Sequence, residues 1–409
     1  MKRLRFLTSG ESHGRGLIGI VEGIPAGLSL STEDIDRDLS RRQTGYGRGG
    51  RMKIEKDHAE LISGVRWGYT MGSPISLLIE NRDWKNWQEG MSPEISHAGS
   101  ISPVTRPRPG HADLTGAMKY NQKDVRNILE RSSARETAMR VATGAVARKF
   151  LSHFGVQIMS AVISIGRAKS GFSFSQLREK EMEGLGQRIE SSPVRCPDEE
   201  ASREMILAID EAITKGDTLG GIFEVVALGL PPGLGSHIQW DTKLDGRLCQ
   251  AMMGIQAIKG VEIGTGFRMA EGFGSEVMDE IFYQKGTEDR IQKSDDRAQS
   301  IGSGFYRETN HAGGIEGGMT NGMPVVVRAA MKPIPTLRQP LRSVDIATKE
   351  AIEAAYERSD ACAVPAAAVV GEAMTALVLA DAFLEKFGGD SMEETMRNLE
   401  AYRDYLRNF

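Results

Sequence analysis

The chain has 409 residues, with 51 Lys or Arg against 55 Asp or Glu, so its formal net charge at pH 7 is −4. A hydrophobic fraction of 40 % is too high, and this net charge too small, for a disordered chain. The charge balance also argues against a dedicated nucleic-acid binder, which usually carries a basic domain. Glycine supplies 47 of the 409 residues, about 11 % against a usual ~7 %, and this excess indicates tight turns or backbone close to a ligand.

The length allows one large domain or two ordinary ones, and no Pro/Ser/Gly linker divides the chain. We expect a single domain over residues 1–409, with the polar segment 168–202 as a candidate peripheral insertion. The N-terminus lacks the apolar core of a signal peptide, and the longest apolar stretch, 373–384, is too short to span a bilayer. Three widely spaced cysteines without CxxC pairing indicate reduced thiols. A cytoplasmic location, without membrane contact, is therefore expected.

In chain order, short strands are predicted at residues 4–8 and 17–22, around a glycine-rich turn. A helix follows to about Arg42, because a capping serine precedes acidic residues at 33 and 34. Residues 124–153 are the strongest helix prediction, with no proline and only Gly144 as glycine. Alanines at helical spacing in its middle suit close packing on another element. This segment is the candidate central helix.

Further along, strands are predicted at 156–165, 221–228 and 323–330. Helices are predicted at 198–214, 243–253, 344–357, 366–387 and 392–406. Strands that occur singly among helices indicate a mixed α and β class. Strict βα alternation and a strand–GxGxxG–helix unit are both missing, which disfavours a dinucleotide-binding Rossmann fold. P-loop, HExxH, GxSxG and EF-hand motifs are also missing, and no histidine lies four residues from another histidine or a cysteine, so no metal is expected.

Polar residues that could carry chemistry lie in glycine-rich loops. His13 is flanked by Gly10, Gly14 and Gly16. A lone histidine is more often structural, but these glycines allow close approach of a ligand, so both interpretations stay open. Imidazole is the natural proton donor near neutral pH.

Two basic segments point to an anionic ligand. Residues 41–53 contain five cations and no acid, and their glycines would let guanidinium groups converge on a phosphate or carboxylate; a solvated basic loop is the alternative. In residues 106–113, His111 follows two arginines and two prolines. There it could donate a proton to a phosphate leaving group, or it could simply be a turn histidine.

Four other segments add candidates. Within the predicted helix, Arg131 and Arg135 share a face and two serines lie beside them. Residues 310–322 and 331–337 combine a glycine-dense loop with a Lys-Pro-x-Pro-Thr turn, which suits a flat or phosphorylated cofactor lying on backbone amides. Asp360 precedes a proline-bounded helix start, where an aspartate is most often an N-cap and could also be a general base.

These segments, in this order, resemble the chorismate synthase family. The resemblance rests on residues 10–14, 42–53, 108–113, 131–137, 259–264, 310–318, 332–336 and 358–360, and it extends over essentially the whole chain. Any one segment alone would be a weak signal, whereas their order and spacing together are specific. One departure is Gln256, where many members carry Asn; both side chains are amides.

The resemblance implies an α+β fold in which helices are sandwiched between antiparallel β-sheets, a layered β-α-β arrangement, in a homotetramer. It implies conversion of 5-enolpyruvylshikimate 3-phosphate to chorismate by 1,4-anti elimination, with loss of phosphate from C3 and of a proton from C6. This reaction requires reduced FMN without net redox change. The reduced FMN would come from an external flavin reductase or another source.

The matching motifs also imply residue roles. The catalytic residues would be His13, which protonates the flavin, His111, which protonates the departing phosphate, and Asp360, which is linked to loss of the C6 proton. The substrate-binding arginines would be Arg42, Arg48, Arg51, Arg108 and Arg135. The FMN contacts would be Arg131, Ser132, Ser133, Gln256, Ala257, Gly317, Lys332, Pro333, Ile334, Pro335, Thr336 and Arg358.

Two rival functions remain at this point. A different flavin enzyme, such as a reductase, would use the same FMN site for net hydride transfer and would consume NADPH. An RNA-binding module could be built on the Gly-Arg loop, although only Tyr46 is interleaved with its cations and no second basic face is evident.

Overall fold

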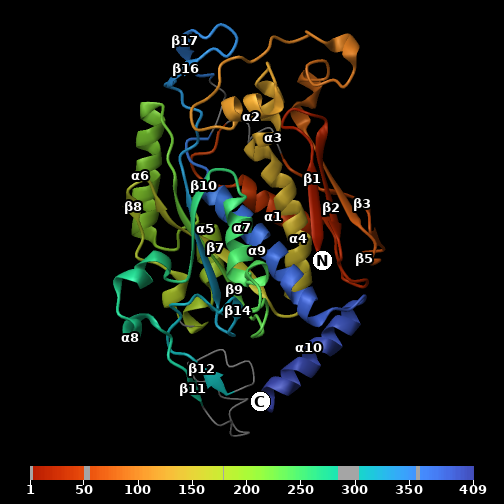
Figure 1. The fold of residues 1–409 in the computed structure, drawn as a ribbon, viewed down its shortest axis with the longest axis vertical. Helices are drawn as coiled ribbons and strands as arrows, with labels where there is room; N and C mark the ends of the chain where they lie inside the picture. The colour runs from red at the N-terminus through yellow and green to blue at the C-terminus, as the bar shows by residue number, and fades with distance from the viewer. Residues whose placement is uncertain (1–2, 50–55, 178, 284–303, 356–359) are drawn as a thin grey trace.

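Two antiparallel sheets enclose a layer of helices (Figure 1). The computed structural model describes residues 3–49, 56–177, 179–283, 304–355 and 360–409. The four-stranded sheet has the order β1 (Arg5–Ser9), β2 (Gly16–Glu22), β6 (Ile75–Glu80) and β3 (Glu60–Ser63). The five-stranded sheet has the order β10 (Ile258–Ile263), β15 (Val325–Met331), β9 (Gly221–Leu228), β7 (Gln157–Ile165) and β8 (Ala168–Lys169).

The helices are α1 (Thr32–Gln43), α2 (Asp113–Tyr120), α3 (Arg126–Ser132), α4 (Thr137–His153), α5 (Leu185–Ser191), α6 (Glu199–Lys215), α7 (Leu244–Met253), α8 (Gly274–Val277), α9 (Val364–Phe387) and α10 (Met392–Arg407). Short paired strands are β4 (Val65–Arg66) with β5 (Tyr69–Thr70), β11 (Phe282–Tyr283) with β12 (Phe305–Tyr306), β13 (Ile315–Glu316) with β14 (Met319–Thr320), and β16 (Arg342–Val344) with β17 (Ala351–Glu353). The expected α+β class and layered β-α-β arrangement are confirmed.

The central layer explains the hydrophobic pattern of the strands. Helix α4 packs on β2, α9 packs on β7 and β9, and the two helices pack on each other. In β2 the residues at 17, 19 and 21 are buried against the helices, while those at 18 and 20 are exposed, which is the alternation of a sheet covered on one face. Strands β7, β9 and β15 are buried on both faces because Phe174, Leu185 and Ile189, within segment 168–202, cover the outer one.

Helix α9 is long and apolar enough to cross a membrane by length and composition. However, 94 % of its most apolar window is buried inside the protein, where it contacts α1, α4, α7 and the five-stranded sheet. A helix that is apolar on all sides is typical of a protein core. Its composition is explained by this central position.

The predicted helix at 124–153 is interrupted. Helix α3 ends at Ser132, Ser133 is extended with φ −63° and ψ 143°, and α4 begins at Thr137 after a short 3₁₀ turn. The Ser133 hydroxyl accepts a hydrogen bond from the Arg135 amide at 3.3 Å, a local contact by which serine competes with helical bonding. Arg131 and Arg135 therefore do not share one helical face, and that prediction is wrong.

The predicted helix at 344–357 is also wrong, because β16 and β17 form a hairpin there. The Asp345 carboxylate accepts hydrogen bonds from the amides of Ala347 and Thr348 at 2.8 and 3.1 Å, and Lys349 has a φ of +67°. An aspartate that bonds the following amides favours a turn over a helix. The other strands and helices predicted above coincide with observed elements within a few residues.

The contact between α4 and α9 leaves no room for one additional methyl group. A Cβ atom built on Gly144 would lie 2.4 Å from the Cβ of Ala373. We expect Gly144→Ala to lower the free energy of unfolding by about 1–3 kcal/mol, the usual cost of overpacking, when it is measured by urea denaturation. The matched control is Gly186→Ala in α5, where the new methyl group meets nothing within 4 Å. It should leave stability unchanged or raise it by up to ~1 kcal/mol.

Candidate active site

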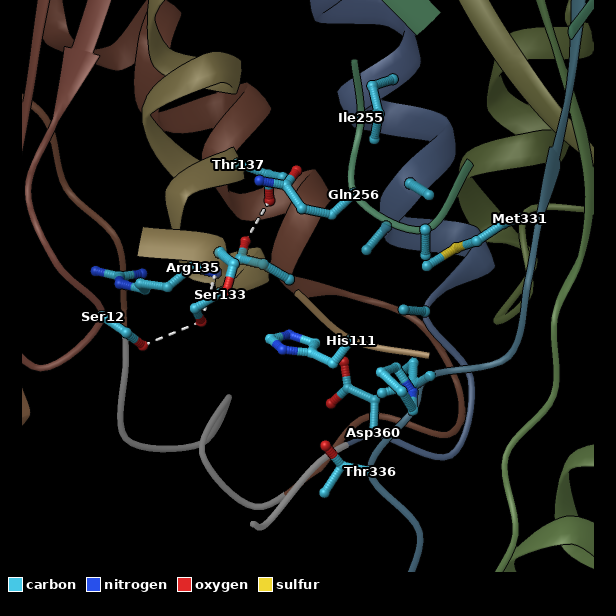
Figure 2. Close-up of a pocket in the computed structure, with 18 of the residues that line it drawn as sticks. Ser12, His111, Ser133, Arg135, Thr137, Ile255, Gln256, Met331, Thr336 and Asp360 are labelled. Carbon is cyan, nitrogen blue, oxygen red and sulfur yellow. Dashed lines mark hydrogen bonds between the residues drawn. The ribbon is translucent and has the colours of Figure 1, made fainter. Parts of the chain in front are cut away.

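A cavity of about 550 Å³ lies where the two helices of the central layer begin (Figure 2). It is lined by Thr137 at the start of α4 and by residues 363, 366, 367 and 370 at the start of α9. Helix N-termini carry partial positive charge and favour anions. The rest of the wall comes from loops that follow β1, α1 and β15, from the segment before α2, and from the turn after α7.

The structure brings most of the candidate residues together in this cavity. Those that line it are His13, Arg42, Arg48, Arg108, His111, Ser132, Ser133, Arg135, Gln256, Ala257, Lys332, Ile334, Pro335, Thr336 and Asp360. Arg51 and Arg358 lie outside the described residues.

Three candidates do not line the cavity. Pro333 lies beside it in the chain. Arg131 points to β1, where its guanidinium donates to the carbonyl oxygens of Thr8 and Gly10 at 2.8 and 3.2 Å. Gly317 lies in the turn between β13 and β14, against His237. Strand β15 runs from Val325 near this hairpin to Met331 at the cavity, so Gly317 is at the far end of the sheet, and its role stays a prediction.

The arginines of the cavity are held by buried acids and amides. Arg42 donates to Thr137 Oγ1 at 2.9 Å and to the carbonyl of Ala134 at 3.0 Å. Its burial lowers the pKa of the Arg42 guanidinium to about 10; the carboxylate of Asp57 opposes this shift, and the positive charges of Arg48 and Arg135 add to it. Cations that disfavour one another's charge in this way are stabilised by a bound anion.

Two side chains that the sequence analysis missed complete this cationic wall. The side chain of Asp57 is fully buried and accepts a hydrogen bond from Arg135, and it lies 3.5 Å from Arg42. Asn81 accepts a bond from Arg135 Nε at 2.8 Å and donates to the carbonyl of Gly14 at 2.8 Å. Asn81 thus ties the cationic wall to the His13 loop. The only local signal for Asp57 is that it is an acid close after a run of cations.

His111 is held by an ionised partner. Its Nδ1 hydrogen bonds to Asp113, and the guanidinium of Arg108 donates to the same carboxylate at 2.9 Å and to Thr336 Oγ1 at 3.2 Å. Burial raises the pKa of Asp113, but the hydrogen bonds from His111 and Arg108 outweigh burial and hold the pKa well below its usual range. Asp113 therefore remains an acceptor that orients the imidazole.

Asp360 and His13 occupy other parts of the wall. The Asp360 carboxylate accepts a bond from the amide of Gly49 at 2.6 Å and pairs with Arg48 at 2.9 Å. The interpretation of Asp360 as an N-cap is not supported, because no side-chain cap bond is present at the start of α9. His13 Nδ1 lies 2.8 Å from Glu130, and its ring centroid lies 4.3 Å from that of Trp87.

Part of the wall fits a flat, hydrogen-bonding ring system. Ile255, Met331 and neighbouring apolar side chains form one side. Gln256 Nε2 donates to Glu136 at 3.0 Å, and Gln256 Oε1 is buried without a hydrogen-bond partner among the described residues. An unsatisfied buried acceptor is costly, so a ligand N–H at this point would stabilise the protein. Among the described residues, no group of three or more His, Cys, Asp or Glu side chains is placed to hold a metal ion.

Beneath the cavity, Glu372 of α9 connects the central helices. It accepts hydrogen bonds from Arg41 of α1 at 2.8 Å, from Arg148 of α4 at 2.9 Å and from Ser160 of β7 at 2.7 Å. Burial raises the pKa of Glu372, but the charges of Arg41 and Arg148 outweigh it and lower the pKa to about 2. The ionised carboxylate is thus part of the scaffold that places Arg42.

Taken together, the fold and the cavity define a class: a layered α+β protein whose arginine-lined cavity carries two carboxylate-held histidines and one further carboxylate. Comparison with known proteins gives the family. The model of the chorismate synthase family matches residues 4–384. The chain is 58 % identical to the chorismate synthase of Aquifex aeolicus over the full length of both, and 58 % identical to that of Geobacter sulfurreducens, covering 99 % of this chain and 100 % of the other.

A solved structure described as a crystal structure of chorismate synthase superposes with a TM-score of 0.79 at 49 % identity, covering all of both chains. The chain belongs to the chorismate synthase family. Its activity is that of a carbon–oxygen lyase in the shikimate pathway.

The depressed pKa of Glu372 predicts acid sensitivity. In the unfolded chain this carboxylate has its ordinary pKa of 4.5, so its stabilisation is complete above that value and is lost as the pH falls towards about 2. We expect the free energy of unfolding, measured by urea denaturation, to decrease from pH 6 to pH 3.5, and Glu372→Gln to reduce this decrease. The control is Glu400→Gln on the exposed surface of α10, which should retain the wild-type pH dependence. An unchanged slope in Glu372→Gln would contradict the prediction.

Proposed function

We propose that this cavity binds reduced FMN together with 5-enolpyruvylshikimate 3-phosphate and eliminates phosphate from C3 and a proton from C6. The observation that carries the proposal is the cationic cavity that contains His111 and Asp360. The substrate has two carboxylates and a phosphate. Four guanidinium groups and Lys332 supply the matching positive charge, in the side-chain type suited to bidentate binding of such groups.

His111 is the proposed proton donor to the departing phosphate. Its Nδ1 hydrogen bonds to Asp113, and its Nε2, which lies 3.5 Å from Arg108 Nη2, would give a proton to the bridging oxygen at C3. A protonated imidazole between Asp113 and a phosphate group is favoured by both negative charges. Arg108 contacts the same carboxylate and Thr336, and it would neutralise charge on the leaving group.

Asp360 is the proposed acceptor of the proton lost from C6. Its carboxylate is oriented by Arg48 and by the amide of Gly49. Arg48 also lines the cavity, and its Nε is buried without a hydrogen-bond partner among the described residues. A substrate carboxylate is a suitable partner for that nitrogen.

The residues that would hold FMN are Ser132, Ser133, Gln256, Ala257, Lys332, Pro333, Ile334, Pro335 and Thr336, together with Arg131 and Gly317, which do not line the cavity, and Arg358, which lies outside the described residues. The chemistry that reduced FMN would supply at these residues is transient electron donation to assist C–O cleavage, with no net consumption of reductant. Gln256 Oε1 offers an acceptor for a ring N–H. The protein supplies orientation, local charge and exclusion of water.

We further propose that the protein is cytoplasmic and that an external flavin reductase, or another source, provides the reduced FMN. A different flavin enzyme that transfers hydride would consume NADPH in proportion to product. The elimination would consume none.

Anaerobic incubation with dithionite-reduced FMN and 5-enolpyruvylshikimate 3-phosphate tests the proposal. We expect chorismate, followed by its absorbance, and equimolar phosphate. A reaction that proceeds equally well without flavin, or that oxidises stoichiometric NADPH, would overturn it.

The assigned roles predict specific kinetic losses. His111→Ala and Asp360→Ala should each lower kcat about 10²- to 10⁴-fold, the usual contribution of a general acid or base. Binding of oxidised FMN, measured by fluorescence quenching, should change far less. Wild-type turnover in either variant would contradict the role of that residue.

A homotetramer is proposed from the family resemblance, and one exposed surface supports self-association. Leu7, Ile18, Ile20 and Ile62 share the outer face of the four-stranded sheet and are 39–69 % exposed. An apolar sheet face of this kind marks an interaction site. The partner we propose for it is a second copy of this chain.

We expect the double substitution Leu7→Glu with Ile20→Glu to lower the mass measured by light scattering, because it places charges in that contact. The control is Leu207→Glu, at a leucine of α6 that is 68 % exposed and away from this sheet. A wild-type chain that is monomeric at micromolar concentration would disprove the tetramer, and a double variant of unchanged mass would disprove this surface.

A further inference from the structure

Glu130 of α3 contacts the His13 loop through three separate bonds. Its Oε2 accepts the backbone N–H of His13 at 2.8 Å, and its Oε1 lies 2.8 Å from His13 Nδ1. Its carbonyl oxygen accepts the N–H of Ser12 at 3.1 Å. Glu130 is only 2 % exposed. One side chain therefore fixes both the backbone and the ring of this histidine.

The chemistry of the carboxylate sets the protonation pattern of the ring. An ionised carboxylate only accepts hydrogen bonds, so His13 Nδ1 must carry the proton. In the neutral imidazole, Nε2 is then the basic nitrogen. Because His13 lines the cavity, Nε2 is the nitrogen that can exchange a proton with a ligand there.

The ring is also held from one face. The Trp87 ring lies 4.3 Å from the His13 ring at an interplanar angle of 35°. Trp87 is itself fixed, since its Nε1 donates to Asp83 at 3.1 Å and the Arg126 guanidinium lies 4.9 Å over its ring. Arg126 in turn lies 3.7 Å from Glu130. These contacts link Trp87, Arg126 and Glu130 to one another beside the imidazole.

We propose that Glu130 is a positioning residue that holds His13 in the Nδ1–H form and presents Nε2 to the cavity. The catalytic consequence rests on the function proposed above, whereas the tautomer does not. A purely structural role would require only the backbone bonds. Such a role does not explain why the second carboxylate oxygen contacts His13 Nδ1.

The test is Glu130→Gln, which preserves size and removes the charge. The new amide oxygen can accept the His13 backbone N–H, and its NH₂ group then donates to Nδ1, which selects the opposite, Nε2–H tautomer. Two-dimensional ¹H–¹⁵N spectra of the imidazoles in the ligand-free protein report the tautomer directly. The signals of His13 are assigned by their loss in His13→Gln. We expect the Nδ1–H pattern in the wild type and the Nε2–H pattern in Glu130→Gln. A wild type in the Nε2–H form would overturn the proposal.

Kinetics provide the second measurement. We expect Glu130→Gln to lower kcat about 10²- to 10⁴-fold, the range associated with a wrong histidine tautomer or a lost acid–base group, with FMN binding changed less than threefold. In a His13→Gln background the same substitution should have little further effect, because Glu130 acts through His13. If the kcat losses of the two single variants were fully additive in the double variant, Glu130 would not act through His13, and the proposal would be overturned.

The matched control is Glu224→Gln. Glu224 is equally buried, accepts the backbone N–H of Phe174 at 2.9 Å and pairs with Arg328, but it lies outside the cavity. It should leave kcat and the His13 signals unchanged.

If Glu130→Gln does not fold, Glu130→Asp retains the charge but is too short to reach both nitrogens at once, and it should lower kcat in the same way. If Glu130→Gln changes the His13 tautomer but the wild type has no lyase activity, the result contradicts the proposed function and leaves this inference standing.

Discussion

Repulsion between guanidinium groups is the constraint around which the cavity is built. Arg42, Arg48, Arg108 and Arg135 line one volume of about 550 Å³, where low polarity makes their mutual repulsion costly. Each has a carboxylate within reach: Asp57 serves Arg42 and Arg135, Asp360 serves Arg48, and Asp113 serves Arg108. Asp57 and Asp113 are not part of the cavity lining, so they offset the repulsion without filling the space in which an anionic ligand would bind, whereas Asp360 lines the cavity itself.

The same acids also arrange the acid–base groups. Asp113 accepts from Arg108 and from His111, so it offsets a cation and orients a proton donor at once. Asp360 pairs with Arg48 and is itself the proposed base. A substitution at either acid therefore changes substrate charge balance and proton transfer together. By contrast, Glu130 contacts His13 without neutralising a substrate-binding arginine, which makes it the cleaner position for separating orientation from charge.

The sequence predicted correctly those features of the fold that depend on a pattern within one helix or strand. The alternation of β2 and the small residues around Gly144 describe single elements, and both lead to the observed packing. The interruption at Ser133 and the turn at Asp345 were missed, because one serine or aspartate bonding to nearby amides overrides helix propensity over a longer window.

The candidate site shows the same division. Segments rich in Arg, His and Gly were identified as candidate functional segments, and the structure places most of them around one cavity. Asp57, Asn81 and Glu130 were not identified as the partners of these side chains. Glu130 is 117 residues from His13, and Asp57 is 78 from Arg135. No local pattern encodes pairing over such distances, since it depends on how α3 and β1 pack.

The two adjacent arginines at the end of α1 show why a run of charge cannot be assigned as a unit. Arg41 turns into the scaffold, where it pairs with Glu372 of α9, and Arg42 turns into the cavity, where it contacts the start of α4. On a helix, neighbouring side chains point about 100° apart. Arg41 therefore serves stability, and Arg42 serves ligand binding. Acid that protonates Glu372 would therefore disturb the helix that carries Arg42, although Glu372 itself is not part of the cavity lining.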